Sequence, residues 1–252
     1  MKPLLAAFLS LLLVGSVQAQ STDAPYKKVA VTSLIGDVIT VDIYRKRVGT
    51  MIDSNLQEKL PVPTAVLDEL ALKTASDAVT KALPSASTAT LSVAAPGSDL
   101  DPAQFLVDGR IAASHRLAVA LRDAGFTHLL VITKQRAQAR LKFASSSVGS
   151  GYLEGIGFYI DNSLNTIRVD TQEKSRGMIA PYVYIKLALV DLASLQQIRE
   201  QVINDSTTRS AAGHAEALDA WGAVTPEEKV SLLQELIREN VSAAIPLLFK
   251  SN

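Results

Sequence analysis

The stretch PYVYIKLALVDL, from Pro181 to Leu192, is the longest β-like run in the chain and decides what kind of fold to expect. Its Val, Ile, Leu and Tyr side chains are typical of strands. Gln197 to Ile203 follows after Ala193-Ser194, a connection short enough for neighbouring strands of a sheet. We therefore expect Gln197 to Ile203 to pair with the long run as its return strand.

Further strands are predicted on the N-terminal side of this run. Lys28 to Leu34 and Val38 to Tyr44 are β-rich and are interrupted by Gly36-Asp37, which predicts an antiparallel hairpin. Phe126 to Thr133 (FTHLLVIT) predicts a buried strand that directly follows a helix, and Thr90 to Ala94 predicts a short strand.

A second hairpin is predicted between Tyr152 and Val169. Tyr152 to Ile160 and Thr166 to Val169 are β-rich, and Asp161-Asn162-Ser163-Leu164-Asn165 lies between them. Asp, Asn and Ser favour turns because their short side chains hydrogen-bond to nearby backbone. The loop of this hairpin is therefore expected at residues 161–165.

Three parts of the chain carry the signals of helices. Thr64 to Leu83 has apolar residues at helical spacing and ends before Pro84. Asp101-Pro102-Ala103-Gln104 has the residues of a helix start, and Gly125 suits the end of that helix. Thr225-Pro226-Glu227-Glu228 has the pattern of a capping box and precedes an amphipathic stripe.

These elements predict an α/β (α+β) protein with a mixed, largely antiparallel sheet, two middle helices and a C-terminal amphipathic helix. Strands and helices do not alternate strictly, which argues against a regular doubly wound sheet. We expect residues 20–252 to form a single globular domain whose last part, 211–250, is helical.

The first residues have the anatomy of a secretory signal peptide. Met1-Lys2 is followed by the apolar run Leu4 to Val14, and Val17-Gln18-Ala19 offers small residues for cleavage after Ala19. A membrane-spanning helix needs about 20 apolar residues, and this run is shorter. The sequence therefore predicts a periplasmic protein of a Gram-negative bacterium, with no transmembrane segment in the mature chain.

Composition excludes several classes of function. The chain has no cysteine, so disulfides, thiolate catalysis and a lipoprotein anchor are not expected. The 25 basic and 25 acidic residues give a formal net charge of zero, which gives no support for nucleic-acid binding. The three histidines are not spaced as metal ligands, so neither a metal nor a cofactor is predicted.

No motif in the chain identifies a reaction. Ser147-Val148-Gly149-Ser150-Gly151 lacks the G-x-S-x-G spacing of a nucleophile elbow and leads into a strand. An exported hydrolase remains an alternative, with a serine or carboxylates near the glycine-rich segment 149–161 as its catalytic groups. Its candidate residues are Ser150, Glu154 and Asp161.

A cationic stripe is predicted in the segment Lys134 to Phe143. Small and apolar residues alternate there with polar ones, so a continuous strand would carry on its outer face Lys134, Arg136, Arg140 and Lys142. Such a stripe is commonly the solvated side of an edge strand, where cations oppose aggregation. The alternative is a recognition surface for an acidic envelope protein or a glycan.

The segment after this stripe combines glycines with aromatic and acidic groups. Gly155 and Gly157 lie on the same face of a strand, where they permit close approach of backbone, an aromatic ring or a ligand. One interpretation is a bulged, packed strand. The other is a platform for a small ligand that also involves Glu154 and Tyr159.

The order of several segments resembles a known family of envelope proteins. The segments are VAVTSL (29–34), LAVALRDAGF (117–126), THLLVIT (127–133) and VYIKLALVDLASLQQIREQ (183–201). They are similar to the α/β periplasmic domains of the curli-secretion and penicillin-binding-protein-activator lipoproteins, in which a glycine-containing turn occupies the place of Leu189 to Ile198. This chain lacks the lipobox cysteine, and Leu195-Gln196 replaces the turn glycine.

The resemblance implies a partner-binding envelope protein without catalysis. Three hypotheses therefore follow from the sequence: an exported, non-enzymatic accessory or interaction protein, an exported hydrolase, and a small-ligand-binding protein. The first is the leading one, because the signal sequence, the missing catalytic spacings and the resemblance all favour it.

Overall fold

The computed structural model of the 252-residue chain describes residues 26–36, 38–46, 55–62, 66–92, 105–143, 146–167, 172, 174–210 and 220–250. Three of the expected features lie outside these ranges. They are the signal peptide with its cleavage site after Ala19, the helix start at Asp101, and the part of the C-terminal helical segment from Ala211 to Asp219.

The described residues form one ten-stranded sheet, a separate two-stranded sheet and three helices. The strands are β1 (Lys28–Leu34), β2 (Val38–Ile43), β3 (Leu56–Pro61), β4 (Ser87–Leu91), β5 (His128–Lys134), β6 (Arg136–Gln138), β7 (Leu141–Phe143), β8 (Ser146–Val148), β9 (Tyr152–Ile167), β10 (Lys174–Asp191), β11 (Gln196–Ser206) and β12 (Arg209–Ser210). The helices are α1 (Val66–Ala82), α3 (Arg116–Asp123) and α4 (Pro226–Phe249). The predicted α+β class is confirmed.

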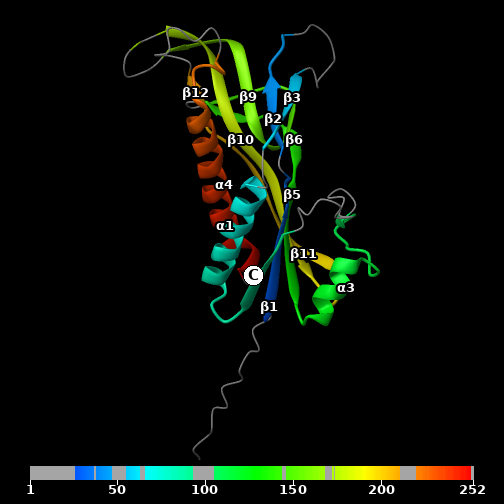
Figure 1. The fold of residues 1–252 in the computed structure, drawn as a ribbon. Coiled ribbons are helices and arrows are strands. Elements are labelled where there is room, and N and C mark those ends of the chain that lie inside the picture. The colour runs from blue at the N-terminus through cyan, green and yellow to red at the C-terminus, as the bar shows by residue number, and fades with distance from the viewer. Residues whose placement is uncertain are drawn as a thin grey trace, which may run out of the picture.

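The long strand β10 organises the sheet. Along one edge it pairs first with β9, up to Tyr184, and then with β5, from Ile185 onward. Along its other edge it pairs with β12 and β11. The predicted pairing of the long run with its return strand is therefore confirmed, and Figure 1 shows β10 extending along the length of the sheet.

The two β-rich segments at the start do not form the predicted hairpin. β1 lies between β4 and β5 and is parallel to both, whereas β2 lies between β3 and β9. The reason is a carboxylate of α1: Asp68 accepts hydrogen bonds from Ser33 Oγ at 2.5 Å and from the backbone N–H of Ile35 and of Gly36, both at 3.0 Å. These bonds hold the end of β1 against α1, so the chain crosses to the other half of the sheet (Figure 1).

The loop predicted at residues 161–165 is also wrong, because β9 continues through it. Asp161 pairs with Met178 and Asn165 with Arg176 across the two strands. The turn-favouring side chains bond within the strand, where Asp161 Oδ1 accepts the Ser163 N–H at 2.7 Å. β10 accordingly begins at Lys174, well before Pro181.

The second predicted helix is shorter than expected. In the second half of the predicted segment only α3 is helical, and His115 caps the N-terminus of α3. Before it, Val107 and Arg110 hydrogen-bond to each other through their backbones. Backbone bonds from Gln197 N–H to Gly109 and from Ile111 N–H to Leu195 tie this segment to the turn between β10 and β11, so it does not form a helix there.

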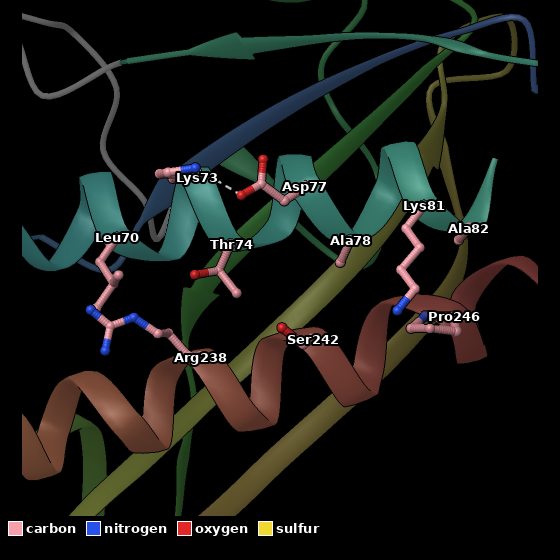
Figure 2. A pocket seen from close by; sticks show the side chains of 10 residues that line it. All are labelled: Leu70, Lys73, Thr74, Asp77, Ala78, Lys81, Ala82, Arg238, Ser242 and Pro246. Carbon is pink, nitrogen blue, oxygen red and sulfur yellow. Dashed lines mark hydrogen bonds and ion pairs between the residues drawn. The ribbon is translucent and has the colours of Figure 1, made fainter. Parts of the chain in front are cut away.

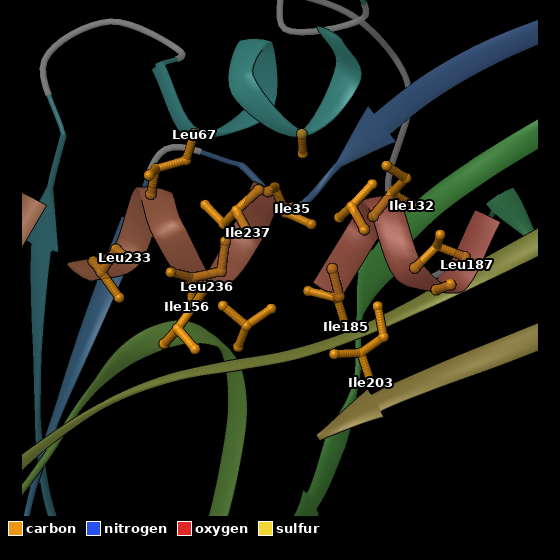
Figure 3. Close-up of a cluster of buried hydrophobic side chains, with 14 of the residues drawn as sticks. Ile35, Leu67, Ile132, Ile156, Ile185, Leu187, Ile203, Leu233, Leu236 and Ile237 are labelled. Carbon is orange, nitrogen blue, oxygen red and sulfur yellow. The ribbon is translucent and has the colours of Figure 1, made fainter. Parts of the chain in front are cut away.

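Layers on both faces cover the sheet. α1 and α4 pack side by side on one face, over a core that includes Ile132, Ile185 and Ile237 (Figures 1 and 3). On the opposite face, α3 covers one apolar cluster and the segment from β6 to β8 covers another, which is rich in tyrosine. None of the helices in the described part of the chain has the length and hydropathy needed to cross a membrane.

Candidate binding groove between α1 and α4

The four predicted cations do not lie along one strand. The segment that carries them is broken into the end of β5, then β6, which pairs with β9, and β7, which pairs with β8. All four side chains are exposed, while Ala139 and Leu141 between them are buried, so the predicted alternation in burial is present. The predicted continuous strand is wrong, because its residues pair with three different strands.

Three of these cations have local partners. Lys142 Nζ lies 2.6 Å from Asp205 Oδ1. The guanidinium of Arg136 lies 4.7 Å from the centre of the Tyr152 ring. The aliphatic part of Lys134 packs over Gly155, where an added Cβ would lie 3.1 Å from the lysine Cδ. These contacts give the side chains separate structural roles at the sheet edge and on β9.

The predicted glycine platform faces packed atoms. A Cβ on Gly157 would lie 2.0 Å from the Thr40 carbonyl oxygen and 2.6 Å from the Tyr182 hydroxyl. Tyr159 is 1% exposed, whereas Glu154 on the same strand points to solvent. The structure therefore brings Gly157 against β2 and a tyrosine ring, as in the packed-strand interpretation.

Buried tyrosines on this face hold the neighbouring elements together. Tyr184 and Tyr159 accept backbone N–H bonds from Arg140 at 3.0 Å and from Ser150 at 3.2 Å. Tyr182 donates to Asp42 Oδ2 at 2.7 Å. Burial raises the pKa of all three tyrosines, and for Tyr182, where the charge of Asp42 adds to it, the pKa lies well above the usual value. Their hydroxyls therefore stay protonated at neutral pH.

The residues proposed for a hydrolase do not form a catalytic constellation. The Ser150 backbone bonds to the Tyr159 hydroxyl and to the Asn55 side chain. Asp161 Oδ1 is occupied by the N–H and the hydroxyl of Ser163. No contact of Ser150 with a histidine is present among the described residues, and no group of three potential metal ligands is found in them either.

His128 and Asp191 form a second polar cluster, at the end of β10. Ser194 donates its hydroxyl to Asp191 Oδ2 at 2.6 Å and its N–H at 3.0 Å, so the carboxylate shapes the turn before β11. Burial lowers the pKa of His128, against an opposing effect of Asp191. Burial acts to raise the pKa of Asp191, but the hydrogen bonds from Ser194 and Ala193 and the nearby His128 together lower it.

Among the described residues, a groove of about 710 Å³ between α1 and α4 has room for a ligand. It is lined by Leu70, Lys73, Thr74, Asp77, Ala78, Lys81, Ala82, Arg238, Ser242 and Pro246. On each helix these positions recur every three or four residues, so they form one stripe along α1 and one along α4. Figure 2 shows the two stripes facing each other along the groove.

Small residues form the middle of the groove and cations stand at its ends. Thr74, Ala78 and Ser242 face one another in the centre (Figure 2). Arg238 lies beside Leu70 at one end, and Lys81 lies beside Pro246 at the other. Both cations are exposed, which allows them to turn toward an anionic group in the groove.

Sequence reasoning missed this groove. Apolar spacing identified both helices, and Leu70, Ala78 and Ala82 belong to the apolar positions of α1, but the spacing does not show that these residues line a groove. Thr74 and Ser242 belong to helices far apart in the chain, and no local signal tells which helices pack together. A second cavity, of about 270 Å³, lies at the start of α4, and its Glu228 is used by the helix cap.

Comparisons with known proteins leave the family open. No protein-family model matches the chain, and no curated protein matches it. A Helicobacter pylori protein described as a homolog of a neuraminyllactose-binding hemagglutinin is similar at 8% identity and a TM-score of 0.41, over 87% of this chain and 83% of that one.

Two further solved structures are similar at comparable levels. The PelC dodecamer from Paraburkholderia phytofirmans has 12% identity and a TM-score of 0.31, over 90% of this chain and 91% of that one. A Xanthomonas campestris protein of the family DUF330 has 7% identity and a TM-score of 0.36, over 88% of this chain and 83% of that one. Likenesses at these TM-scores and identities transfer no function to this chain.

Proposed function

We propose that this chain is an exported, non-enzymatic interaction protein of the Gram-negative envelope, which binds its partner in the groove between α1 and α4. The observation that carries the proposal is the groove itself, a long hollow with small residues along its middle and a cation at each end. Ligand sites are commonly concave and largely apolar, with a few polar groups that fix orientation.

The elements around the groove support a binding role. α4 begins with a complete capping box, in which Thr225 Oγ1 accepts the Glu228 N–H at 3.2 Å and Glu228 Oε2 accepts the Thr225 N–H at 2.9 Å. Both helices are anchored by buried side chains on their inner faces. A rigid groove loses little conformational entropy when a partner binds.

The export part of the proposal rests on residues 1–19 and on the resemblance to envelope lipoproteins. N-terminal sequencing of the protein purified from its own cells is the direct test. The expected mature chain begins at Gln20, and recovery of a chain that retains Met1 would overturn this part.

The binding part is tested by photocrosslinking in the intact envelope. A photoreactive residue at Thr74 is expected to capture a defined partner, whereas one at the exposed Ser147 on β8 is not. Substituting Ala78→Trp in the Thr74 variant should abolish the product, because the indole fills the middle of the groove. Equal capture from both positions, or capture that survives Ala78→Trp, would overturn the assignment of the groove.

A second candidate, a small-ligand-binding protein, is favoured by the size of the groove. Sites for small molecules have volumes of about 300–1,000 Å³, and the groove falls within that range. A ligand that binds only the native state raises the melting temperature. Such a rise in the wild type, lost in Ala78→Trp, would favour this candidate over a macromolecular partner.

A further inference from the structure

We propose that the groove receives an amphipathic α-helix of a partner protein, with small apolar residues on its inner face and an acidic residue at each end. This inference rests on the proposed function and names the chemistry of the partner.

The groove has the length and the straight walls needed to hold a helix. Its α1 wall runs from Leu70 to Ala82, about 18 Å at 1.5 Å per residue. α4 supplies the other wall through Arg238, Ser242 and Pro246, which are four residues apart, and the walls run in the same direction (Figure 2). A third helix laid between two such ridges places its own ridge in the groove, as in known helix-in-groove complexes.

The floor accepts a close backbone approach and offers polar groups. Thr74, Ala78 and Ser242 leave space for small side chains of an incoming helix. Pro246 has no backbone N–H, so the Ser242 carbonyl lacks the donor that an α-helix would normally supply. A Ser or Thr on the inner face of the partner helix is the matching donor for this carbonyl.

The charges of the groove select acidic residues at two separate points. Lys73 Nζ is paired with Asp77 Oδ2 at 2.8 Å, and the cations at the two ends are Lys81 and Arg238, of which Arg238 also donates to Gln234 Oε1 at 3.3 Å. Arg238 lies beside Leu70, and eleven residues of helix separate Leu70 from Lys81, so the ends are about 16 Å apart. A fatty acid carries one anionic head and meets only one of these cations. A helix with two acidic residues eleven positions apart meets both, because eleven residues are close to three full turns.

The test uses a labelled helical peptide as the probe and fluorescence anisotropy of the mature chain. The peptide has 15 residues, Leu, Ala and one central Ser on one face, and Glu at positions 2 and 13. A second peptide has Lys at these two positions. We expect the Glu peptide to bind at least ten-fold more tightly, and its affinity to fall as salt is added.

Charge reversal in the protein identifies the site. The variant Lys81→Glu with Arg238→Glu is expected to reverse the preference, so that the Lys peptide binds more tightly. The matched control, Lys59→Glu with Arg122→Glu, changes two exposed cations on β3 and α3 and should keep the wild-type preference. Circular dichroism of both variants checks that they are folded.

The remaining outcomes overturn the inference in distinguishable ways. If dodecanoate binds, the peptides do not, and Ala78→Trp abolishes dodecanoate binding, the groove is a lipid site, which overturns the helix and favours the small-ligand candidate. If peptide binding is unchanged in Ala78→Trp or in the charge-reversed protein, the helix binds elsewhere. If neither probe binds and the Thr74 crosslinker captures nothing, the proposed function fails as well.

Discussion

Gly157 sits where three strands meet, and its missing side chain is what lets them meet. Thr40 of β2 pairs with it on one side and Tyr182 of β10 on the other. The ring of Tyr182 reaches across the glycine to Asp42, whose second oxygen accepts a bond from Gln57 Nε2 at 2.6 Å. One tyrosine thereby connects β10 to β2 across the full width of β9.

Gly157→Ala is expected to lower the free energy of unfolding by about 3 kcal/mol or more, because the new methyl group collides with backbone that cannot move aside. Urea denaturation followed by circular dichroism measures the loss. The control is Gly125→Ala, at a position with φ of +78° and open space around it. Its cost is confined to backbone strain, about 1 kcal/mol. Equal losses in the two variants would contradict the steric argument.

His128 makes the stability of the fold depend on pH. The folded-state pKa of His128 lies below its unfolded value, so protonation is less favourable in the folded protein. Its contribution to stability is therefore fully present above the unfolded pKa of about 6.5 and is lost as the pH falls through that value toward the folded pKa. The melting temperature should drop between pH 7.5 and 5.5. His128→Asn should flatten this part of the curve, and an unchanged slope would show that other groups cause the dependence.

Between elements, the carboxylate of Asp68 attaches α1 to the end of β1. Asp68→Ala removes the acceptor for the N–H groups of Ile35 and Gly36, of which Ile35 is buried. The free energy of unfolding is expected to fall by about 2–4 kcal/mol. The buried N–H group has lost its hydrogen bonds to water and no longer has an acceptor in the protein. Chemical denaturation of Asp68→Ala measures this loss. The control is Asp77→Ala, which removes an exposed carboxylate from the same helix, and an equal loss in the two variants would assign the effect to charge instead of to the bonds of Asp68.

Thr225→Ala removes the cap of α4 and is expected to cost about 1 kcal/mol. The control is Thr80→Ala, because the Thr80 hydroxyl bonds only to the Ser76 carbonyl on the exposed side of α1. It should cost a few tenths of a kcal/mol. Thermal denaturation distinguishes the two, and a similar loss in both would assign the effect to helix propensity instead of capping.

Local signals in the sequence predicted where helices and strands lie better than they predicted which strands pair. The capping box at Thr225, the helical spacing in α1 and the hairpin of β10 with β11 are encoded within a few residues, and all three are present. The pairing of β1 depends on Asp68, over thirty residues away, and the path after Lys134 depends on β9. A local sequence pattern does not reveal such long-range contacts. The predictions of a hairpin at Gly36 and of a continuous cationic strand were therefore wrong.

At the scale of the whole molecule, the candidate site is a product of packing. The groove exists because α1 and α4, which are separated by most of the sheet in sequence, lie side by side over one core. The sequence identified candidate residues by chemical type: cations, glycines and a tyrosine. The structure places the glycines and the tyrosine in the interior, while Thr74, Ala78 and Ser242, which carry no distinctive chemistry, form the hollow.

The pairing of β10 with both β9 and β5 also affects the order in which the sheet can form. A chain made only as far as residue 173 has β1, β4 and β5 in one group and β2, β3 and β9 in another, without the strand that joins them. Neither group gains its central neighbour until β10 arrives, and such long-range pairing is slow to form. A polypeptide that threads through a membrane pore from its N-terminus would therefore stay open for two thirds of its passage. In a chain exported in this way, the strand order would keep the two halves of the sheet apart until β10 has crossed.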